Sequence, residues 1–189
     1  MTPENLIEVL WPAETEEELA VYAVLDGARN AGIYPALSSS GCEYECLYRG
    51  ELEPDLAQVA PYLVKLVKDH PFTYWLLGKG WGDSWGIFVR SPAALRELRH
   101  HFRKFLMVYS PDAKPLYFRY YDPRVLRIYL PTCNSEELET VFGPVESYTL
   151  EDADPDTLLK LTSSEGALHT QKIALAAADA GIGVYNKTA

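Results

Sequence analysis

The stretch Leu19-Ala20-Val21-Tyr22-Ala23-Val24-Leu25-Asp26-Gly27 decides the fold, because seven consecutive hydrophobic residues are closed by a pair of turn-forming residues. A run of this length, preceded by glutamates and followed by a turn, is typical of a buried β-strand. We therefore place a core strand here and look for further elements on both sides of it along the chain.

Short apolar runs bounded by glycine, proline or polar clusters predict five more strands, at residues 45–48, 60–67, 85–89, 116–121 and 145–150. Helical spacing of apolar residues, together with start and stop signals, predicts helices at residues 28–37, 72–77, 92–106, 124–130 and 134–142. Residues 1–10 are expected to form either an opening strand or a lead-in segment. Strands that alternate with helices predict an α/β fold in which helices cover a mixed β-sheet.

The length of the chain, 189 residues, is enough to bury one core and too short for two domains of ordinary size. We expect one α/β domain over residues 1–150. Beyond Glu151 the sequence becomes polar and acidic, so residues 151–189 are expected to form a linker and a short C-terminal appendage. An alanine-rich stretch predicts a weak helix over residues 171–180 in this appendage.

The sequence contains no run of the roughly 20 apolar residues that cross a bilayer, and its start lacks the features of a signal peptide. We expect a cytoplasmic protein with no membrane partner. The odd number of cysteines, Cys42, Cys46 and Cys133, fits a reducing compartment. Since neither they nor the four histidines show the spacing of metal ligands, no metal site is expected.

The formal net charge of -10 is unevenly distributed along the chain. Residues 61–133 hold twelve basic and five acidic side chains, whereas residues 1–60 hold two and twelve, and residues 134–189 hold three and ten. Either the basic segment steers an acidic partner to one face, or it folds against the acidic ends of the chain itself. Nucleic acid is not an expected partner, because the acidic ends would repel its phosphates.

An amphipathic helix with a basic outer face is predicted within the basic segment, with Ser91 as its N-cap and Pro92 as its first residue. The adjacent His100 and His101 are expected to be exposed on it. Aromatic residues are favoured at interfaces, so tryptophans near the glycines of residues 78–86 either line a groove or form a packed corner. The candidate partner-binding residues are Arg96, Arg99, Arg103, Lys104, Trp81 and Trp85.

Motifs of the common enzyme classes are absent from the sequence. It has no Gly-x-Ser-x-Gly, no phosphate-binding loop, no dinucleotide fingerprint and no His-Glu-x-x-His. The nearest nucleophile motif is Gly82-Asp83-Ser84, which some lipases share, but His169 is preceded by Gly166 where those enzymes have an aspartate. The sequence therefore favours a binding protein over an enzyme.

Two aspartates, Asp26 and Asp122, follow predicted strands, and α/β folds often place active sites at such strand ends. A small hydrolase that uses Asp26, Asp122 or Ser84 is therefore the alternative. The favoured role of Asp122 is to cap the helix that begins near Arg124. We interpret Asp26, Asp122, Arg119 and Arg124 together as a structural brace rather than a catalytic set.

Seven short blocks within residues 19–150 occur in a recognisable order. They are Leu25-Asp26-Gly27-Ala28-Arg29, Tyr44-Glu45-Cys46-Leu47-Tyr48 with Gly50-Glu51-Leu52, Ala60-Pro61-Tyr62-Leu63-Val64, Trp81-Gly82 with Trp85-Gly86-Ile87-Phe88, Phe118 to Leu126, Leu130-Pro131-Thr132 and Phe142-Gly143-Pro144-Val145. Together and in this order they resemble the type VI secretion adaptor domain, a family long catalogued as a domain of unknown function.

The resemblance implies an adaptor or chaperone that works without catalysis and without a cofactor. Such a protein binds a cognate effector, often by a segment near the effector's start, and helps to load it on the VgrG spike. The expected partners are therefore a secreted effector protein and the VgrG spike protein. The matching blocks are interpreted as defining the fold, so the resemblance does not by itself place the docking surface.

Overall fold

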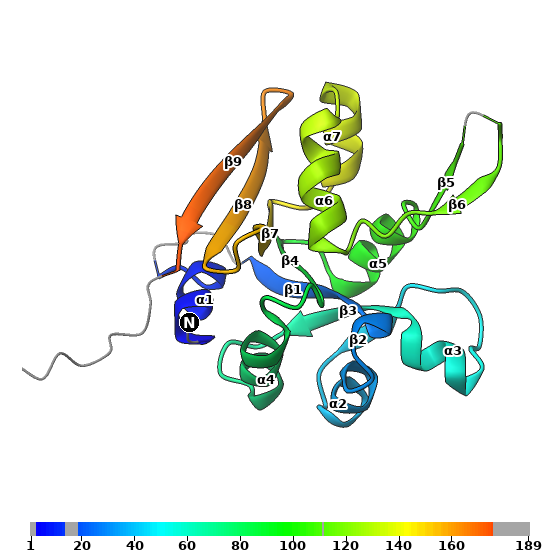
Figure 1. Ribbon diagram of the computed structural model, residues 1–189, viewed down its shortest axis with the longest axis vertical. Coiled ribbons are helices and arrows are strands. Elements are labelled where there is room, and N and C mark those ends of the chain that lie inside the picture. The colour runs from blue at the N-terminus through cyan, green and yellow to red at the C-terminus, as the bar shows by residue number, and fades with distance from the viewer. Residues whose placement is uncertain (1–2, 14–18, 111, 176–189) are drawn as a thin grey trace, which may run out of the picture.

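The computed structural model describes residues 3–13, 19–110 and 112–175, and it confirms an α/β fold with helices covering a β-sheet (Figure 1). The main sheet has seven strands in the order β2-β3-β1-β4-β7-β8-β9, and each of its described pairings is antiparallel rather than a mixture of directions. Its strands are β1 (Ala20–Asp26), β2 (Tyr44–Cys46), β3 (Pro61–Leu66), β4 (Gly86–Ser91), β7 (Ser147–Glu151), β8 (Thr157–Ser164) and β9 (Ala167–Ala174).

Strand β1 lies inside the sheet, where β3 pairs with one of its edges and β4 with the other. Its side chains alternate between two cores: Tyr22 and Val24 belong to one hydrophobic cluster, and Val21, Ala23 and Leu25 belong to the other. Because successive side chains of a strand point to opposite faces, burial of both sets requires cover on both faces. This explains why the stretch is uniformly hydrophobic rather than alternating.

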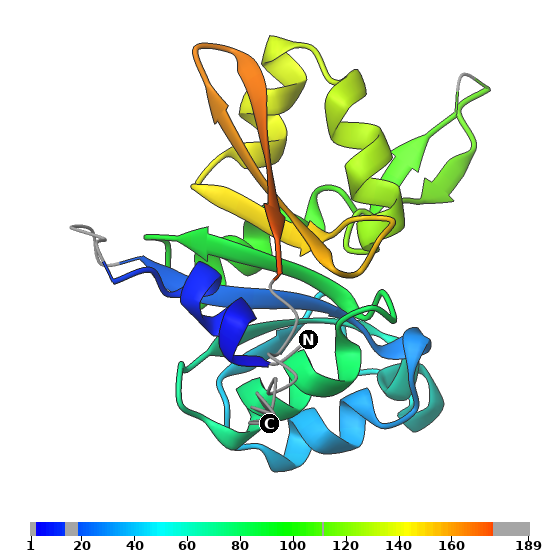
Figure 2. The same cartoon turned by 60° about the vertical axis from the view of Figure 1, so that its left-hand side comes forward.

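Helices cover both faces of the sheet, as the two views show (Figures 1 and 2). Three helices supply side chains to the first core: α5 (Leu95–Arg103), α6 (Pro123–Tyr129) and α7 (Ser135–Phe142). Three others supply the second core: α1 (Pro3–Leu10), α2 (Ile33–Ser39) and α4 (Pro71–Gly80). The remaining short elements are α3 (Pro54–Val59), η1 (Gly27–Arg29) and η2 (Leu130–Thr132).

Helix α1 covers Pro3–Leu10, so the strand expected as one of two alternatives for residues 1–10 does not form there. Leu6, Ile7 and Leu10 of α1 are buried, and their spacing of one and four residues puts them on one helical face. Among the described residues no helix is both long enough and apolar enough to cross a membrane.

The start of α5 differs from the prediction of a Ser91 cap. The helix begins at Leu95, with Ala94 as its N-cap. Ser91 instead ends β4, and its hydroxyl donates a hydrogen bond of 2.5 Å to the carbonyl of Pro144 and accepts one of 3.1 Å from the backbone N–H of Ala93. The hydroxyl therefore ties the end of the strand to a neighbouring loop, which is a competing use for the same side chain.

The stretch 116–121, expected as one strand, divides in two. Only residues up to Tyr117 are extended, as strand β6 (Pro115–Tyr117), which pairs with β5 (Met107–Tyr109) in a separate two-stranded sheet. Tyr120 and Tyr121 leave the strand and are buried in the first core. Burial of these two aromatic rings, rather than continued strand pairing, decides the backbone path here.

The C-terminal part also differs from the prediction, since residues expected as a linker form strands of the main sheet. Strand β8 pairs with β7 along Leu158 to Leu161, and β9 pairs with β8 along its whole length. Leu158, Leu159 and Leu161 are buried in the two cores, which anchors β8. Residues 171–174 belong to β9 and are not helical, and residues 176–180 of the predicted helix lie outside the described residues.

Candidate functional site

Helix α5 is strongly amphipathic. Its buried side chains are Leu98, His101 and Phe102, and its other face is basic. That face borders a hollow of about 320 Å³, which we name the cationic hollow. Its lining residues are Arg49, Arg96, Arg99, His100, Arg103 and Lys104.

The positive charge of the cationic hollow is only partly neutralised by the protein itself. Arg99 forms an ion pair of 3.2 Å with Glu45 and donates a hydrogen bond of 3.0 Å to the carbonyl oxygen of Cys46. Within residues 3–13, 19–110 and 112–175, Arg49, Arg96, Arg103 and Lys104 form no ion pair. The hollow thus keeps a surplus of positive charge facing solvent.

The side chains of the hollow repel one another. Partial burial, followed by the nearby guanidinium groups of Arg99 and Arg49, lowers the pKa of Arg103 below its ordinary value. A bound anion would relieve this repulsion, since opposite charges at close range stabilise each other. The arrangement suits the binding of carboxylate or other anionic groups.

Four of these residues were candidate partner-binding residues in the sequence analysis, and all four line the same hollow: Arg96, Arg99, Arg103 and Lys104. Arg49 was missed. It lies in the loop after β2, directly before Gly50, whose backbone is left-handed with φ of 77°. The only signal in the sequence is that Arg49 is one of two basic residues among the first sixty, which gives no hint of its neighbours.

The two candidate tryptophans lie elsewhere, in the core on the other side of the sheet from α5. Trp85 is buried, with its ring centroid 5.3 Å from that of Trp75. Trp81 stacks on Phe88 and donates a hydrogen bond of 2.7 Å from Nε1 to the carbonyl oxygen of Pro155. Of the two alternatives, the structure therefore has the packed corner, and neither ring lines the cationic hollow.

The brace residues form two separate pairs. The Arg119 guanidinium donates to the buried carboxylate of Asp26, which also accepts a hydrogen bond of 3.1 Å from the backbone N–H of Ala28. Asp122 caps α6, as predicted, and accepts hydrogen bonds from both the backbone N–H and the side chain of Arg124. Both carboxylates are thus engaged in holding the ends of local structure.

Burial opposes ionisation of Asp122, but the side-chain and backbone hydrogen bonds from Arg124 outweigh it and hold the pKa of the Asp122 carboxyl below its ordinary value. A carboxylate with a lowered pKa is a poor proton acceptor at neutral pH, and general-base catalysis needs a pKa near the working pH. This environment suits a structural role.

Ser84 also has a specific partner. Its hydroxyl donates a hydrogen bond of 2.7 Å to Glu151, and that buried carboxylate accepts a second one, of 2.5 Å, from the backbone N–H of Gly82. Ser84 has a left-handed backbone with φ of 57°, so Glu151 fixes a tight turn. Asp26, Asp122 and Ser84 are each bonded to a different partner, and among the described residues no hydrogen bond joins any two of them. No motif in the sequence indicates this role of Glu151.

His101 is buried, so the prediction that it is exposed was wrong, whereas His100 is exposed as predicted. The ring packs between α5 and α7, where Nε2 lies 3.0 Å from the carbonyl oxygen of Val141. Burial lowers the pKa of His101, although the hydrogen bond with Val141 opposes this. A neutral imidazole that donates from Nε2 fits these surroundings.

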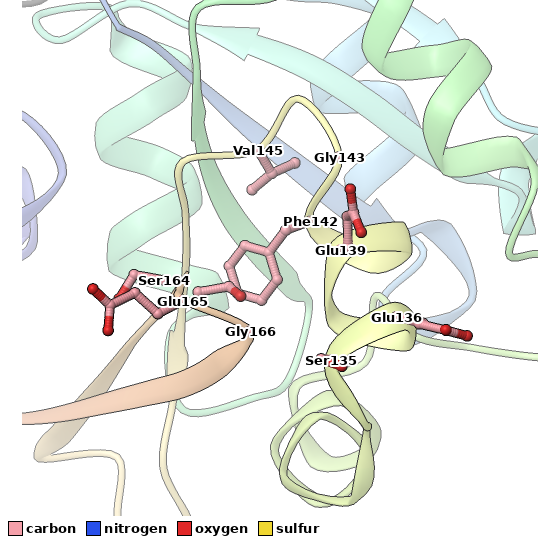
Figure 3. A pocket seen from close by; sticks show the side chains of 10 residues that line it. Ser135, Glu136, Glu139, Phe142, Gly143, Val145, Ser164, Glu165 and Gly166 are labelled. Carbon is pink, nitrogen blue, oxygen red and sulfur yellow. The ribbon is translucent and has the colours of Figure 1, made fainter.

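A second hollow, of about 350 Å³, lies between α7 and the turn that joins β8 to β9 (Figure 3). The ring of Phe142 points into it, while Glu136 and Glu165 lie at opposite sides. Carboxylates must converge to bind a metal ion, and in the described part of the chain no group of three possible metal ligands is close enough to do so.

One protein-family model matches the chain. Its description is "Domain of unknown function (DUF4123)", and the match covers residues 21–140, which is more than half of the chain. The matched range includes β1 from Val21 onward, all of the cationic hollow and both Asp–Arg pairs. Comparisons with curated proteins and with solved structures gave no match.

Proposed function

The chain belongs to the DUF4123 family, and on that premise we propose that it is an adaptor or chaperone for a type VI secretion effector. It binds the cognate effector, by a segment near the effector's start, and helps to load it on the VgrG spike. It carries out no catalysis and remains in the cytoplasm. The resemblance of the sequence blocks in residues 19–150 to the type VI secretion adaptor domain supports this role.

The observation that carries the proposal is the surplus positive charge of the cationic hollow. Side chains from α5 and the loop after β2 converge there, and Arg49, Arg96, Arg103 and Lys104 have no ion-pair partner among the described residues. A protein whose formal net charge is -10 gains little solubility from a concentrated basic patch. Such a patch instead speeds the approach of an acidic partner and selects against basic ones.

The alternative function, a small hydrolase, has weaker support than the adaptor role. Asp26, Asp122 and Ser84 are each bonded to a group of the protein itself. An adaptor must also release its cargo, so a dissociation constant of roughly micromolar to nanomolar is suitable. Contacts between charges at a solvent-exposed hollow provide affinity of this order when joined by apolar contacts.

The test is a pull-down of the tagged protein from the cells that produce it, read by mass spectrometry, with and without the spike protein. We expect recovery of one large effector protein. Recovery of neither effector nor spike, from cells shown to express both, would contradict the adaptor role. Salt should weaken the capture, because exposed charges separated by more than about 8 Å are largely screened at physiological ionic strength.

Two double variants test whether the effector binds at the cationic hollow. Arg96→Glu with Arg103→Glu reverses two charges of the hollow and should reduce the recovered effector at least about tenfold, a loss of ~1.4 kcal/mol in binding. Lys68→Glu with Lys79→Glu, at two exposed positions outside the hollow, changes the net charge equally and serves as the control. Equal loss with both pairs would show a dependence on net charge rather than on the hollow.

A further inference from the structure

Beside the cationic hollow stands a two-stranded sheet that is separate from the main one. Strands β5 and β6 form a hairpin that projects from the body of the protein next to α5 (Figure 1). We name it the β5–β6 hairpin. All six residues of its strands are exposed. They include five large hydrophobic side chains: Met107, Val108, Tyr109, Leu116 and Tyr117.

The two faces of the hairpin differ in their side chains. Met107 lies opposite Tyr117, and Tyr109 lies opposite Pro115, whereas Val108 lies opposite Leu116. Residues opposite each other in an antiparallel pair share a face, and alternate residues along a strand return to it. Met107, Tyr109 and Tyr117 therefore form one face, the tyrosine face, and Val108 and Leu116 form the other.

A ring contact connects the tyrosine face with the chain segment that carries Arg49 of the cationic hollow. The ring centroid of Tyr117 lies 6.3 Å from that of Tyr48, which is half-buried. Tyr48 directly precedes Arg49, which is one of the residues that line the hollow. The charge of Arg49 contributes to the lowered pKa of Arg103. The ring contact of Tyr117 therefore places the tyrosine face beside the chain segment that carries Arg49.

The exposure of these tyrosines is unusual for a structural element of this size. Tyr109 is 72% exposed and Tyr117 is 73% exposed. An isolated two-stranded hairpin is at best marginally stable, and burying its apolar side chains is the ordinary way to stabilise it. Tyrosine is enriched at protein interfaces because it offers a large apolar contact and loses little conformational freedom on binding.

We propose that the tyrosine face and the cationic hollow form one docking surface for an extended segment of a partner protein in which acidic residues adjoin aromatic or aliphatic ones. The acidic residues lie in the hollow, where they meet the arginines that form no ion pair with the described part of the chain. The neighbouring apolar residues pack on Tyr109 and Tyr117. This inference rests on the proposed function, since it names the chemistry of the effector segment that the adaptor binds.

The inference is tested with three labelled synthetic peptides and the full chain, by fluorescence anisotropy. The composite peptide has about twelve residues, enough to extend over roughly 40 Å, with glutamates in one half and alternating tryptophan and leucine in the other. The second peptide, the acidic peptide, keeps the glutamates and has glycine and serine in place of the apolar half. The third peptide keeps the apolar half and has glycine and serine in place of the glutamates. We expect the composite peptide to bind at least about tenfold more tightly than either of the others.

Variants of the hairpin then separate its two faces. Tyr109→Ser with Tyr117→Ser should reduce binding of the composite peptide to the level of the acidic peptide. Val108→Ser with Leu116→Ser removes comparable apolar groups from the other face and should leave binding unchanged. Tyr109→Ser alone provides a second reading, because Tyr109 contacts no other aromatic ring among the described residues, whereas Tyr117 lies beside Tyr48. Circular dichroism establishes that each variant is folded.

Two results would overturn the inference: equal binding of the composite and acidic peptides, or equal losses from changes to the two faces. Its failure can be told apart from failure of the adaptor role. If the wild-type protein captures an effector in the pull-down and the tyrosine variants capture it equally well, the docking surface is wrong and the adaptor role stands. If the peptide results hold but no effector or spike is captured, the adaptor role is wrong and the docking surface stands.

Discussion

Replacing Asp122 by alanine removes two interactions at the start of α6 at once. The first is the cap, in which the carboxylate accepts a hydrogen bond of 2.9 Å from the backbone N–H of Arg124; loss of such a cap costs about 1 kcal/mol. The second is the ion pair of 2.6 Å with the Arg124 guanidinium. Because the Arg124 side chain is 49% exposed, solvent screening limits this pair to about 0.5 kcal/mol.

The Asp122 side chain is almost completely buried, so water does not readily replace the lost cap on the backbone N–H of Arg124, and the loss of this cap costs more than the ordinary value. We therefore expect Asp122→Ala to lower the free energy of unfolding by about 2 kcal/mol. For a chain of this size, that corresponds to a fall of roughly 4–8 °C in Tm. Urea denaturation followed by circular dichroism measures the first quantity, and a thermal scan measures the second.

The matched control is Asp122→Asn, which keeps an oxygen that can cap the helix and removes only the charge. Asparagine and aspartate are nearly equal as caps, so we expect this variant to lose about 0.5 kcal/mol. If Asp122→Asn costs as much as Asp122→Ala, the cap is not the main contribution and the reasoning is refuted.

The dependence on pH gives an independent check of the Asp122–Arg124 pair. The folded-state pKa of Asp122 lies below its unfolded value, so the charged pair stabilises the folded state above about pH 3.9. This contribution is lost as the pH falls through the folded-state pKa. The difference in stability between the wild type and Asp122→Asn should therefore shrink between about pH 5 and pH 2.

Three further predictions concern a glycine beside His101, His101 itself and Ser84. Gly143→Ala should lower the free energy of unfolding by about 2 kcal/mol in urea denaturation, because Gly143 has φ of 46° and a Cβ would lie 2.6 Å from Cε1 of His101. Its control, Gly41→Ala, should lower it by only about 1 kcal/mol, because Gly41 has φ of 76° but open space around it. Because burial lowers the pKa of His101, the unfolded state binds a proton more readily than the folded state does. The wild type should therefore lose stability as the pH falls below about 6.5, and His101→Gln should make this dependence of stability on pH less steep. Ser84→Ala should lower the free energy of unfolding by about 1 kcal/mol, because it removes one of two hydrogen bonds to the buried Glu151, yet leave effector capture unchanged; loss of capture without loss of stability would point to a functional Ser84.

Local signals in the sequence were enough for elements whose residues agree with their surroundings. The uniform hydrophobic run predicted β1, and the pair Asn134 and Glu137 forms a complete capping box at the start of α7. Signals failed where long-range packing competes with local preference. Ser91 and Pro92 have the form of a helix start, but the Ser91 hydroxyl bonds to Pro144, which is more than fifty residues away in the chain.

The C-terminal strands could not be predicted for a related reason. β9 is an edge strand with mostly exposed side chains, so it has little of the hydrophobic alternation by which a strand is recognised. Its backbone pairing with β8 over eight residue pairs holds it in the sheet. Alanine-rich composition in residues 171–180 favoured a helix, but the pairing available to residues 171–174 prevails over that weak preference.

The candidate site divides in the same way. Basic residues of one helix can be found from the sequence, because helical spacing puts them on one face. Arg49 and the tyrosine face could not be found from the spacing of residues in the sequence. Their positions near α5 depend on the path of the loop after β2 and on a hairpin that is separate from the main sheet.

The charge asymmetry of the sequence allowed two interpretations, steering of a partner or neutralisation within the chain, and the structure shows partial neutralisation within the chain. Arg99 is paired with Glu45, and Arg119 with Asp26, so two basic residues of the middle segment do meet the acidic N-terminal segment. Helix α5 nevertheless buries its apolar face and so must present its remaining side chains to solvent. That geometric requirement holds the arginines of the cationic hollow at the surface, where among the described residues Arg99 alone of them has an ion pair. Under the adaptor proposal, a partner with acidic side chains supplies the compensating charge. Charge-reversed variants of the hollow therefore test docking, whereas variants of the two Asp–Arg pairs test stability.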